Sequence, residues 1–325
     1  MASPRRIDVH FHLIPPFYRE AVYAAGRGPA LGKYPEWTPE LALDVMDAHG
    51  IEVALTSLAQ PGVGFGSAAS AQALARRCND YAAELVARWP TRFGAFGTVP
   101  IWSIMGALEE SAYSLVVLKF DGVSLFASYG ENFLGDPGFD PLLAMLNERG
   151  AVVFVHPGLH PSSKGLALPW PAFMMEYLFD TTRAAVNLIF SGAIERFPRV
   201  RFILPHAGGL APYFAWRLSV SPMIDPRLPQ LARAGLRRLQ AFLVRQRALA
   251  RGTDLRRARS RRAAGARRVR HRLPLRQSAR HRRDGQDLRI RVPFAGAARA
   301  NRPHQRPRAV SETLLTDPPY REPRP

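Results

Sequence analysis

The stretch "FDPLLAMLNERGAVVFVHPG", residues 139–158, contains the pattern of a helix, a turn and a strand in direct succession. The helical pattern ends at Gly150, and the apolar run Ala151–His156 follows it. Short apolar strands that alternate with helices are typical of parallel sheets covered by helices. If this unit recurs along the chain, it predicts an α/β fold.

The same unit recurs on both sides of this stretch. The sequence predicts further strands at Ile7–Phe11, 51–58, Phe93–Val99, 122–126 and Arg201–Pro205, with helical patterns such as 41–48 between them. Roughly six repeats favour a (β/α)8 barrel of the TIM type over a doubly wound sheet. No GxGxxG motif follows the first strand, which argues against dinucleotide binding.

Four histidines lie at the ends of these strands. His10 and His12 are two apart on one strand and therefore share a face, while His156 ends one later strand and His206 ends the next. The carboxyl ends of barrel strands converge on one face, where active sites are usually built. A single histidine is more often structural, but imidazole is a common metal ligand and four such positions favour a metal site. Two histidines on one strand and a third across the barrel would supply three ligands.

The other histidines of this region have simpler interpretations. His160 follows the strand by four residues and is expected in a loop. His49 precedes Gly50 at the end of a helix, where a cation is favourable. Neither histidine is predicted to bind a metal.

Composition limits the class of protein. A chain of 325 residues with 47% hydrophobic residues can hold one large α/β domain or two smaller ones. No apolar run approaches the length of a membrane span, and the first residues lack the apolar region of a signal peptide. The single cysteine, Cys78, excludes an internal disulfide framework. These features predict a cytoplasmic protein.

The formal charge of +19 is concentrated at the C-terminal end. Residues 244–325 hold 24 arginines, 6 acidic residues and no lysine, whereas residues 1–243 are almost neutral. One hypothesis is a nucleic-acid-binding arm, which would show a steep dependence of affinity on salt. Such arms usually mix lysine with arginine and carry aromatic residues that stack on bases. The composition therefore argues against a nucleic-acid partner.

Five segments within about residues 5–240 carry a family likeness: "IDVHFHLIPP", "DGVSLFASYG", "FDPLLAMLNERGAVVFVHPG", "MEYLFDTTRAAVNLIFSG" and "RFPRVRFILPHAGG". They resemble the amidohydrolase-related (amidohydrolase 2) branch of the amidohydrolase superfamily. Within it, the sequence looks most like the metal-dependent decarboxylases of 6-methylsalicylate, γ-resorcylate and aminocarboxymuconate semialdehyde. The ordered set HxH, FVHPG and LPHAGG is far more specific than the HxH pair alone.

The resemblance implies a zinc ion, or alternatively manganese, held by His10, His12 and His156. It also implies that His206 holds or activates water at the metal and acts as an acid/base, and it suggests a homodimer. The family's fourth ligand is an aspartate in a "GSDFP"-like motif, which this sequence lacks. Asp254 lies nearest to the expected place, but no apolar strand precedes it and no proline follows.

The activity implied is non-oxidative decarboxylation of a small aromatic or enoic carboxylic acid. The first alternative is metal-dependent hydrolysis of a lactone or an amide on the same scaffold. The second, from another class, is nucleic-acid binding by the basic tail. Phe11 and the residues near Trp170 and Phe173 are candidates for the walls around an aromatic substrate.

A change of reading frame explains the arginine-rich end. In GC-rich DNA, codons for Ala, Gly, Val and Asp that are read one base early commonly encode arginine. Three segments are compatible with family motifs in the neighbouring frame: "FLVRQRAL" (242–249) with "FWYDNALS", "RVRHRLPLRQ" (268–277) with "VFGTDFPFAN", and "NRPHQRPRAV" (301–310) with "IDRTNALALF". The second of these restores the missing aspartate.

We therefore infer a single frame slip at or just before Leu243. The sequence predicts an incomplete amidohydrolase-type barrel over residues 1–242 and a disordered arginine-rich tail over 243–325. A barrel without its last strands has open edges and an uncovered core. The chain as written is accordingly expected to be inactive or unstable.

Overall fold

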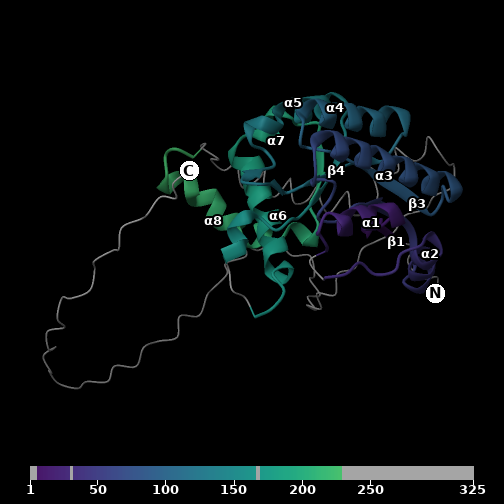
Figure 1. Cartoon of the computed structure of the whole chain (residues 1–325). Helices are drawn as coiled ribbons and strands as arrows, with labels where there is room; N and C mark the ends of the chain where they lie inside the picture. Colours follow the sequence, from purple (N-terminus) through teal and green to yellow (C-terminus); the bar gives the residue numbers. More distant parts are fainter. Residues whose placement is uncertain (1–5, 30–31, 166–168, 229–325) are drawn as a thin grey trace, which may run out of the picture. The chain divides into compact units, whose positions relative to one another are not determined.

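A computed structural model describes residues 6–29, 32–165 and 169–228, all of which belong to one unit of the chain, Met1–Leu273. Their main feature is a six-stranded parallel sheet in the order β1-β2-β3-β4-β7-β8. Figure 1 shows the chain with β1, β3 and β4 labelled. The strands are β1 Arg6–His12, β2 Ile51–Ser57, β3 Phe93–Thr98, β4 Gly122–Phe126, β7 Val152–His156 and β8 Arg201–Ile203. A short antiparallel ribbon, β5 Ser128–Tyr129 and β6 Asn132–Phe133, follows β4.

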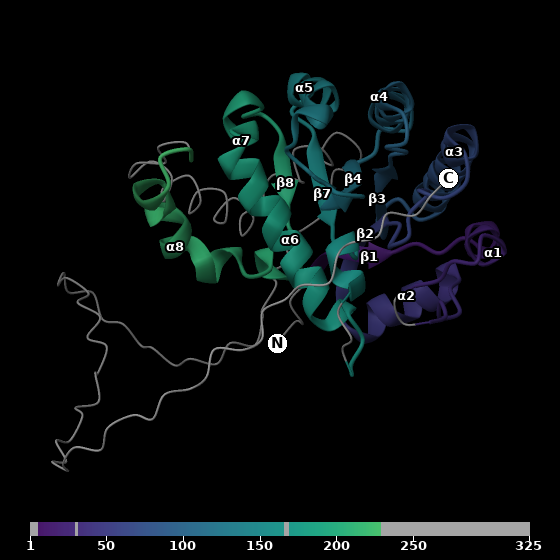
Figure 2. The ribbon, with the colours of Figure 1, turned by 60° about the vertical axis from the view of Figure 1, so that its left-hand side comes forward.

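Helices connect the strands and cover one face of the sheet. They are α1 Pro16–Ala24, α2 Pro39–Ala48, α3 Ala68–Arg88, α4 Ile104–Ala112, α5 Asp140–Glu148, α6 Phe173–Phe190, α7 Ala193–Arg196 and α8 Ala211–Ile224. A π-helical turn, Tyr113–Val117, extends α4, and 3-10 turns span Pro137–Phe139, Pro161–Gly165 and His206–Gly208. Figure 2 shows β3, β4, β7 and β8 side by side, with α3, α4 and α5 along the outer side of the curled sheet.

Both faces of the sheet are apolar, which explains the uninterrupted hydrophobic strands. On the outer face, alternate strand residues such as Val153 and Val155 pack with the helices. On the inner face, Val53, Leu55 and Phe154 belong to a cluster that contains strand residues alone. Because residue 156 shares the parity of residue 154, the side chain of His156 emerges on this inner face.

The structure confirms the strands that the sequence predicts, mostly to within a residue. One difference concerns the last of them, because β8 ends at Ile203 rather than at Pro205. Proline has no backbone N–H to donate to the ladder, and His206 then turns away with a φ of 51°. His206 therefore follows the strand instead of ending it. The β5–β6 ribbon was not predicted from the sequence.

The fold class predicted from the sequence, an α/β barrel of the TIM type, is confirmed for the part of the chain that the structure describes. Six parallel strands in chain order, each joined to the next through a helix, form the curled sheet of such a barrel. The proposed boundary near residue 242 and the tail 243–325 lie outside the described residues. Among the described helices, none is long and apolar enough to cross a membrane.

Candidate metal centre

An irregularity in β1 sets the direction of its two histidines. The register between β1 and β2 shifts between Asp8 and Phe11, and the His10 N–H donates to the Asp8 carboxylate at 2.8 Å. Before the shift, Ile7 and Val9 pack against the inner-face cluster. After it, His10 and His12 occupy that face, although regular alternation would have turned them outward. A bulge of this kind commonly redirects side chains near functional sites.

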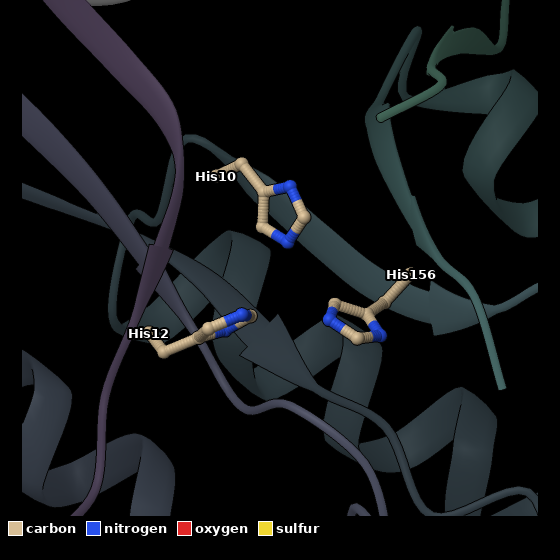
Figure 3. Close-up of side chains that lie close together, drawn as sticks. All are labelled: His10, His12 and His156. Carbon is tan, nitrogen blue, oxygen red and sulfur yellow. The ribbon is translucent and has the colours of Figure 1, made fainter. Parts of the chain in front are cut away.

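His10, His12 and His156 point toward one another from β1 and β7 (Figure 3). One nitrogen of each ring lies within 4.8 Å of the corresponding nitrogens of the other two. The ring centroid of His12 lies 4.9 Å from that of His10 and 5.1 Å from that of His156. Among the described residues, this is the one group of three or more potential ligands with such spacing.

Burial keeps these imidazoles neutral. Burial is the main cause that lowers the pKa of His10 to about 3, and the nearby rings of His12 and His206 act in the same direction. Burial is also the main cause that lowers the pKa of His12, and it holds that of His156 well below 6.5. A neutral imidazole has a lone pair to offer, so the cluster is in the protonation state that metal binding requires.

The hydrogen bonds of the cluster fit a divalent metal. The Nε2 atom of His10 and the Nδ1 atom of His12 are buried and have no hydrogen-bond partner in the described structure. His156 places its Nδ1 atom 2.7 Å from the Pro157 carbonyl oxygen, which can only accept, so this nitrogen carries the proton and Nε2 is left with its lone pair. In metal-binding histidines, a hydrogen bond from the ring nitrogen that does not bind the metal fixes the orientation of the ring. Three neutral nitrogens would suit zinc or another first-row divalent ion.

His206 lies beside the three histidines without joining them. It begins a 3-10 turn after β8, and its ring centroid is 5.2 Å from that of His10. Partial burial lowers its pKa below 6.5, although the residue is exposed. The structure therefore separates three convergent histidines from a fourth that flanks them. This is the division of roles that the sequence predicts, and the roles themselves stay predictions.

Aromatic side chains surround His156. The ring centroids of Phe126 and Tyr177 lie 5.6 Å and 6.2 Å from that of His156. Phe173 contacts Tyr177, with 6.1 Å between the ring centroids. Phe11 instead packs into the outer-face cluster, since it alternates with the two histidines of β1. Phe11 therefore does not face the histidines as expected, whereas the rings of Phe126 and Tyr177 lie beside them.

The two remaining histidines of this region lie apart from the cluster. His160 is in the loop after β7, as predicted, but it is buried and its ring stacks on Phe133 with centroids 4.7 Å apart. His49 is exposed and is the C-cap residue of α2.

Sequence reasoning did not identify the polar residues of α6 that contact the loops around the histidines. The Tyr177 hydroxyl donates to the Gln60 side-chain oxygen at 2.9 Å. The fully buried Asp180 accepts from the Gly158 N–H at 2.6 Å and from the Ser128 hydroxyl at 2.8 Å. The one available signal was the run of polar residues in "YLFDTT", 177–182, inside an otherwise apolar helix.

The barrel sheet and its cluster of histidines agree with the family comparison. The family described as Amidohydrolase matches residues 7–234, and the chain belongs to this family. The resemblance drawn from the HxH, FVHPG and LPHAGG segments is thereby confirmed.

The relatives that the chain resembles carry more particular names. Over 225 residues it is 42% identical to decarboxylase yanB of Aspergillus niger, covering 65% of this chain and 61% of that protein. Over 227 residues it is 39% identical to the 6-methylsalicylic acid decarboxylase of Penicillium expansum, covering 68% of this chain and 70% of that protein. The solved 2,6-dihydroxybenzoate decarboxylase from Rhizobium is 26% identical, with a TM-score of 0.56 over 70% of this chain and 75% of that one. The chain thus spans less than two thirds of the Aspergillus protein.

Proposed function

We propose that the chain is built as a metal-dependent decarboxylase that removes the carboxyl group of a small aromatic acid without oxidation. The observation that carries the proposal is the convergence of His10, His12 and His156 within 4.8 Å, next to His206. The names of the relatives support the same reaction. Zinc is the first choice for the ion and manganese the second. A dimer and a cytoplasmic location stay predictions.

The residues divide the chemistry between them. A divalent ion held by His10, His12 and His156 would act as a Lewis acid toward the carboxylate or an adjacent hydroxyl of the substrate. Phe126 and Tyr177 offer rings beside His156, against which a planar substrate can pack. The imidazole of His206 would deliver a proton to the ring carbon as the bond to the carboxyl carbon breaks and carbon dioxide leaves.

Metal binding can be tested without turnover, in the chain with its reading frame restored before codon 243. Replacing His156 by alanine removes one of the three nitrogens, and we expect zinc affinity to fall by about 100-fold or more, since loss of an outer-shell partner alone costs about 10- to 100-fold. The His49→Ala protein is the control, because His49 is an exposed histidine outside the cluster. Calorimetric titration with zinc and with manganese measures both affinities. Equal zinc affinity in the two variants would show that zinc does not bind at the cluster of His10, His12 and His156.

Turnover separates decarboxylation from the hydrolytic alternative. In the chain with its reading frame restored before codon 243, hydroxybenzoates should release carbon dioxide, whereas lactones should remain intact. His206→Asn should retain metal but lose about 100-fold or more in kcat, the usual range for a removed acid/base group. If lactones are hydrolysed and no hydroxybenzoate releases carbon dioxide, the decarboxylase proposal is wrong and the metal-dependent hydrolase is the better assignment.

A further inference from the structure

The segment that carries His206 has an unusual backbone. Four consecutive residues have positive φ angles: 51° at His206, 56° at Ala207, 85° at Gly208 and 61° at Gly209. Side chains with a Cβ atom rarely adopt this left-handed conformation, so His206 and Ala207 are strained. Such strain persists only where neighbouring structure fixes the backbone, and it is common at functional sites. A contact that fixes this turn must therefore exist.

Helix α6 supplies that contact. A Cβ atom added at Gly209 would lie 2.5 Å from the Leu178 carbonyl oxygen and 2.7 Å from the Thr182 hydroxyl, so the turn rests directly on the helix. The Thr182 hydroxyl accepts a hydrogen bond from the Leu210 N–H at 2.8 Å and donates to the Leu178 carbonyl at 2.6 Å. Because its proton is committed to Leu178, its lone pair is directed at Leu210.

We propose that Thr182 is a positioning residue for His206. Its hydroxyl holds the 206–210 segment by accepting from the Leu210 N–H. The conformation of this segment then sets the position of the His206 ring, whose centroid lies 5.2 Å from that of His10. Thr182 is 6% exposed, so no solvent competes for this bond to any large extent. The inference rests on the proposed function for the chemical role of His206, but the contact itself does not.

The neighbouring Thr181 provides a matched control. It is buried, as Thr182 is, but its hydroxyl donates at 2.9 Å to the Tyr177 carbonyl of its own helix. Valine has the shape of threonine without the hydroxyl. Thr182→Val therefore breaks the link to the turn, whereas Thr181→Val breaks only a bond within α6. Thr182→Ser keeps the hydroxyl.

The first experiment measures hydrogen exchange of backbone amides over residues 205–211 in the full chain. Thr182→Val should speed exchange in this segment by about tenfold, since the Leu210 N–H loses its acceptor and the turn opens more often. Thr181→Val and Thr182→Ser should leave the segment unchanged. Equal exchange in the two valine variants, or unchanged exchange in Thr182→Val, would overturn the proposal.

The second experiment separates positioning from general destabilisation. In the chain with its reading frame restored before codon 243, Thr182→Val should lower kcat by about 10- to 100-fold, as expected for a displaced reacting group, while KM and zinc content stay at the values of the restored parent. Thr182→Ser should restore kcat. A loss of zinc, or a change confined to KM, would overturn the assignment of Thr182 to His206. If the chain with its reading frame restored before codon 243 decarboxylates no aromatic acid, the proposed function fails, and the exchange experiment on the chain as written still decides the role of Thr182.

Discussion

At the scale of single residues, the site depends on side chains that are costly to bury. His10, His12 and His156 give up hydration and lie close enough to repel one another once charged. Because the rings stay neutral, the free-energy cost of burying them is far smaller than it would be for charged rings. The same burial that prepares three lone pairs for a metal makes the metal-free protein sensitive to acid.

Stability of the metal-free protein should fall as the pH falls. The unfolded chain takes up a proton at His10 near pH 6.5, whereas the folded chain does so only near pH 3. Between these values the unfolded state binds more protons, so the stabilising effect is complete above about pH 6.5 and is lost progressively below it. Tm measured from pH 8 to pH 4 with a chelator present should show this slope.

The variants His10→Gln and His49→Gln test the source of that slope. The first should make the profile less steep, since His12 and His156 still contribute, while the second, which alters an exposed histidine, should keep the slope. A wild-type Tm that does not change between pH 7 and pH 4.5 would contradict the argument.

Gly62 should tolerate no side chain because of Phe126. A Cβ atom at Gly62 would lie 2.5 Å from the Phe126 ring, and φ there is 65°. At Gly26, φ is 64° and no atom lies within 4 Å of the same position. Gly62→Ala should therefore lower the free energy of unfolding by about 1–3 kcal/mol more than Gly26→Ala, because only the first adds overpacking to backbone strain. Urea titration measures both, and equal losses would show that Phe126 moves aside freely.

At the scale of elements, the sequence predicts what local patterns determine. Most of the six strands are recognisable as short apolar runs, β1 alternates polar and apolar residues, and the glycine turns at Gly50 and Gly150 precede β2 and β7. The bulge in β1 and the contacts of α6 are not recognisable, since they depend on partners far along the chain. The histidine cluster, by contrast, was predictable without knowledge of any particular contact. The parallel strands of a barrel bring their carboxyl ends to one face, however far apart they lie in the sequence.

Helix α3 offers a chemical probe of its own packing. Cys78 is 1% exposed in the buried face of α3, and burial raises the pKa of its thiol. Because the thiolate is the reactive form, the native protein should resist a disulfide-exchange reagent at pH 8 and react once urea unfolds it. The reaction is followed by absorbance.

The matched variant is Ala87→Cys, which places a second thiol at an exposed position of the same helix. This thiol should react at once in the native protein. Rapid stoichiometric reaction of the wild-type chain would show that α3 opens readily.

At the scale of the whole molecule, the family match ends a few residues before the proposed change of frame. The match ends at residue 234, and the frame slip inferred from the arginine-rich end lies at or just before Leu243. Family membership rests on the residues before this point. The sequence as written has no "GSDFP"-like motif, whose aspartate the resemblance implies as a fourth ligand.

Restoring the frame should restore the enzyme. A version in which the reading frame changes just before codon 243 should bind zinc and decarboxylate hydroxybenzoates, whereas the chain as written should do neither at a comparable rate. Metal content and carbon dioxide release of the two purified proteins measure the difference. Stoichiometric zinc and ordinary turnover in the chain as written would refute the frame slip as the cause of a defect. The coding DNA around codon 243 is the direct check.

The separation of the three histidines along the sheet has a consequence for biosynthesis. His10 and His12 leave the ribosome in the first strand, and His156 follows in the fifth, with β2, β3 and β4 made in between. An ion held by all three histidines would link β1 to β7, the first and last of the sheet strands made by then. It would act as a crosslink that forms late in synthesis. Zinc uptake during synthesis would then begin when β7 has joined the sheet that β1 started. Zinc content measured on ribosome-bound nascent chains of increasing length would show at which length this happens.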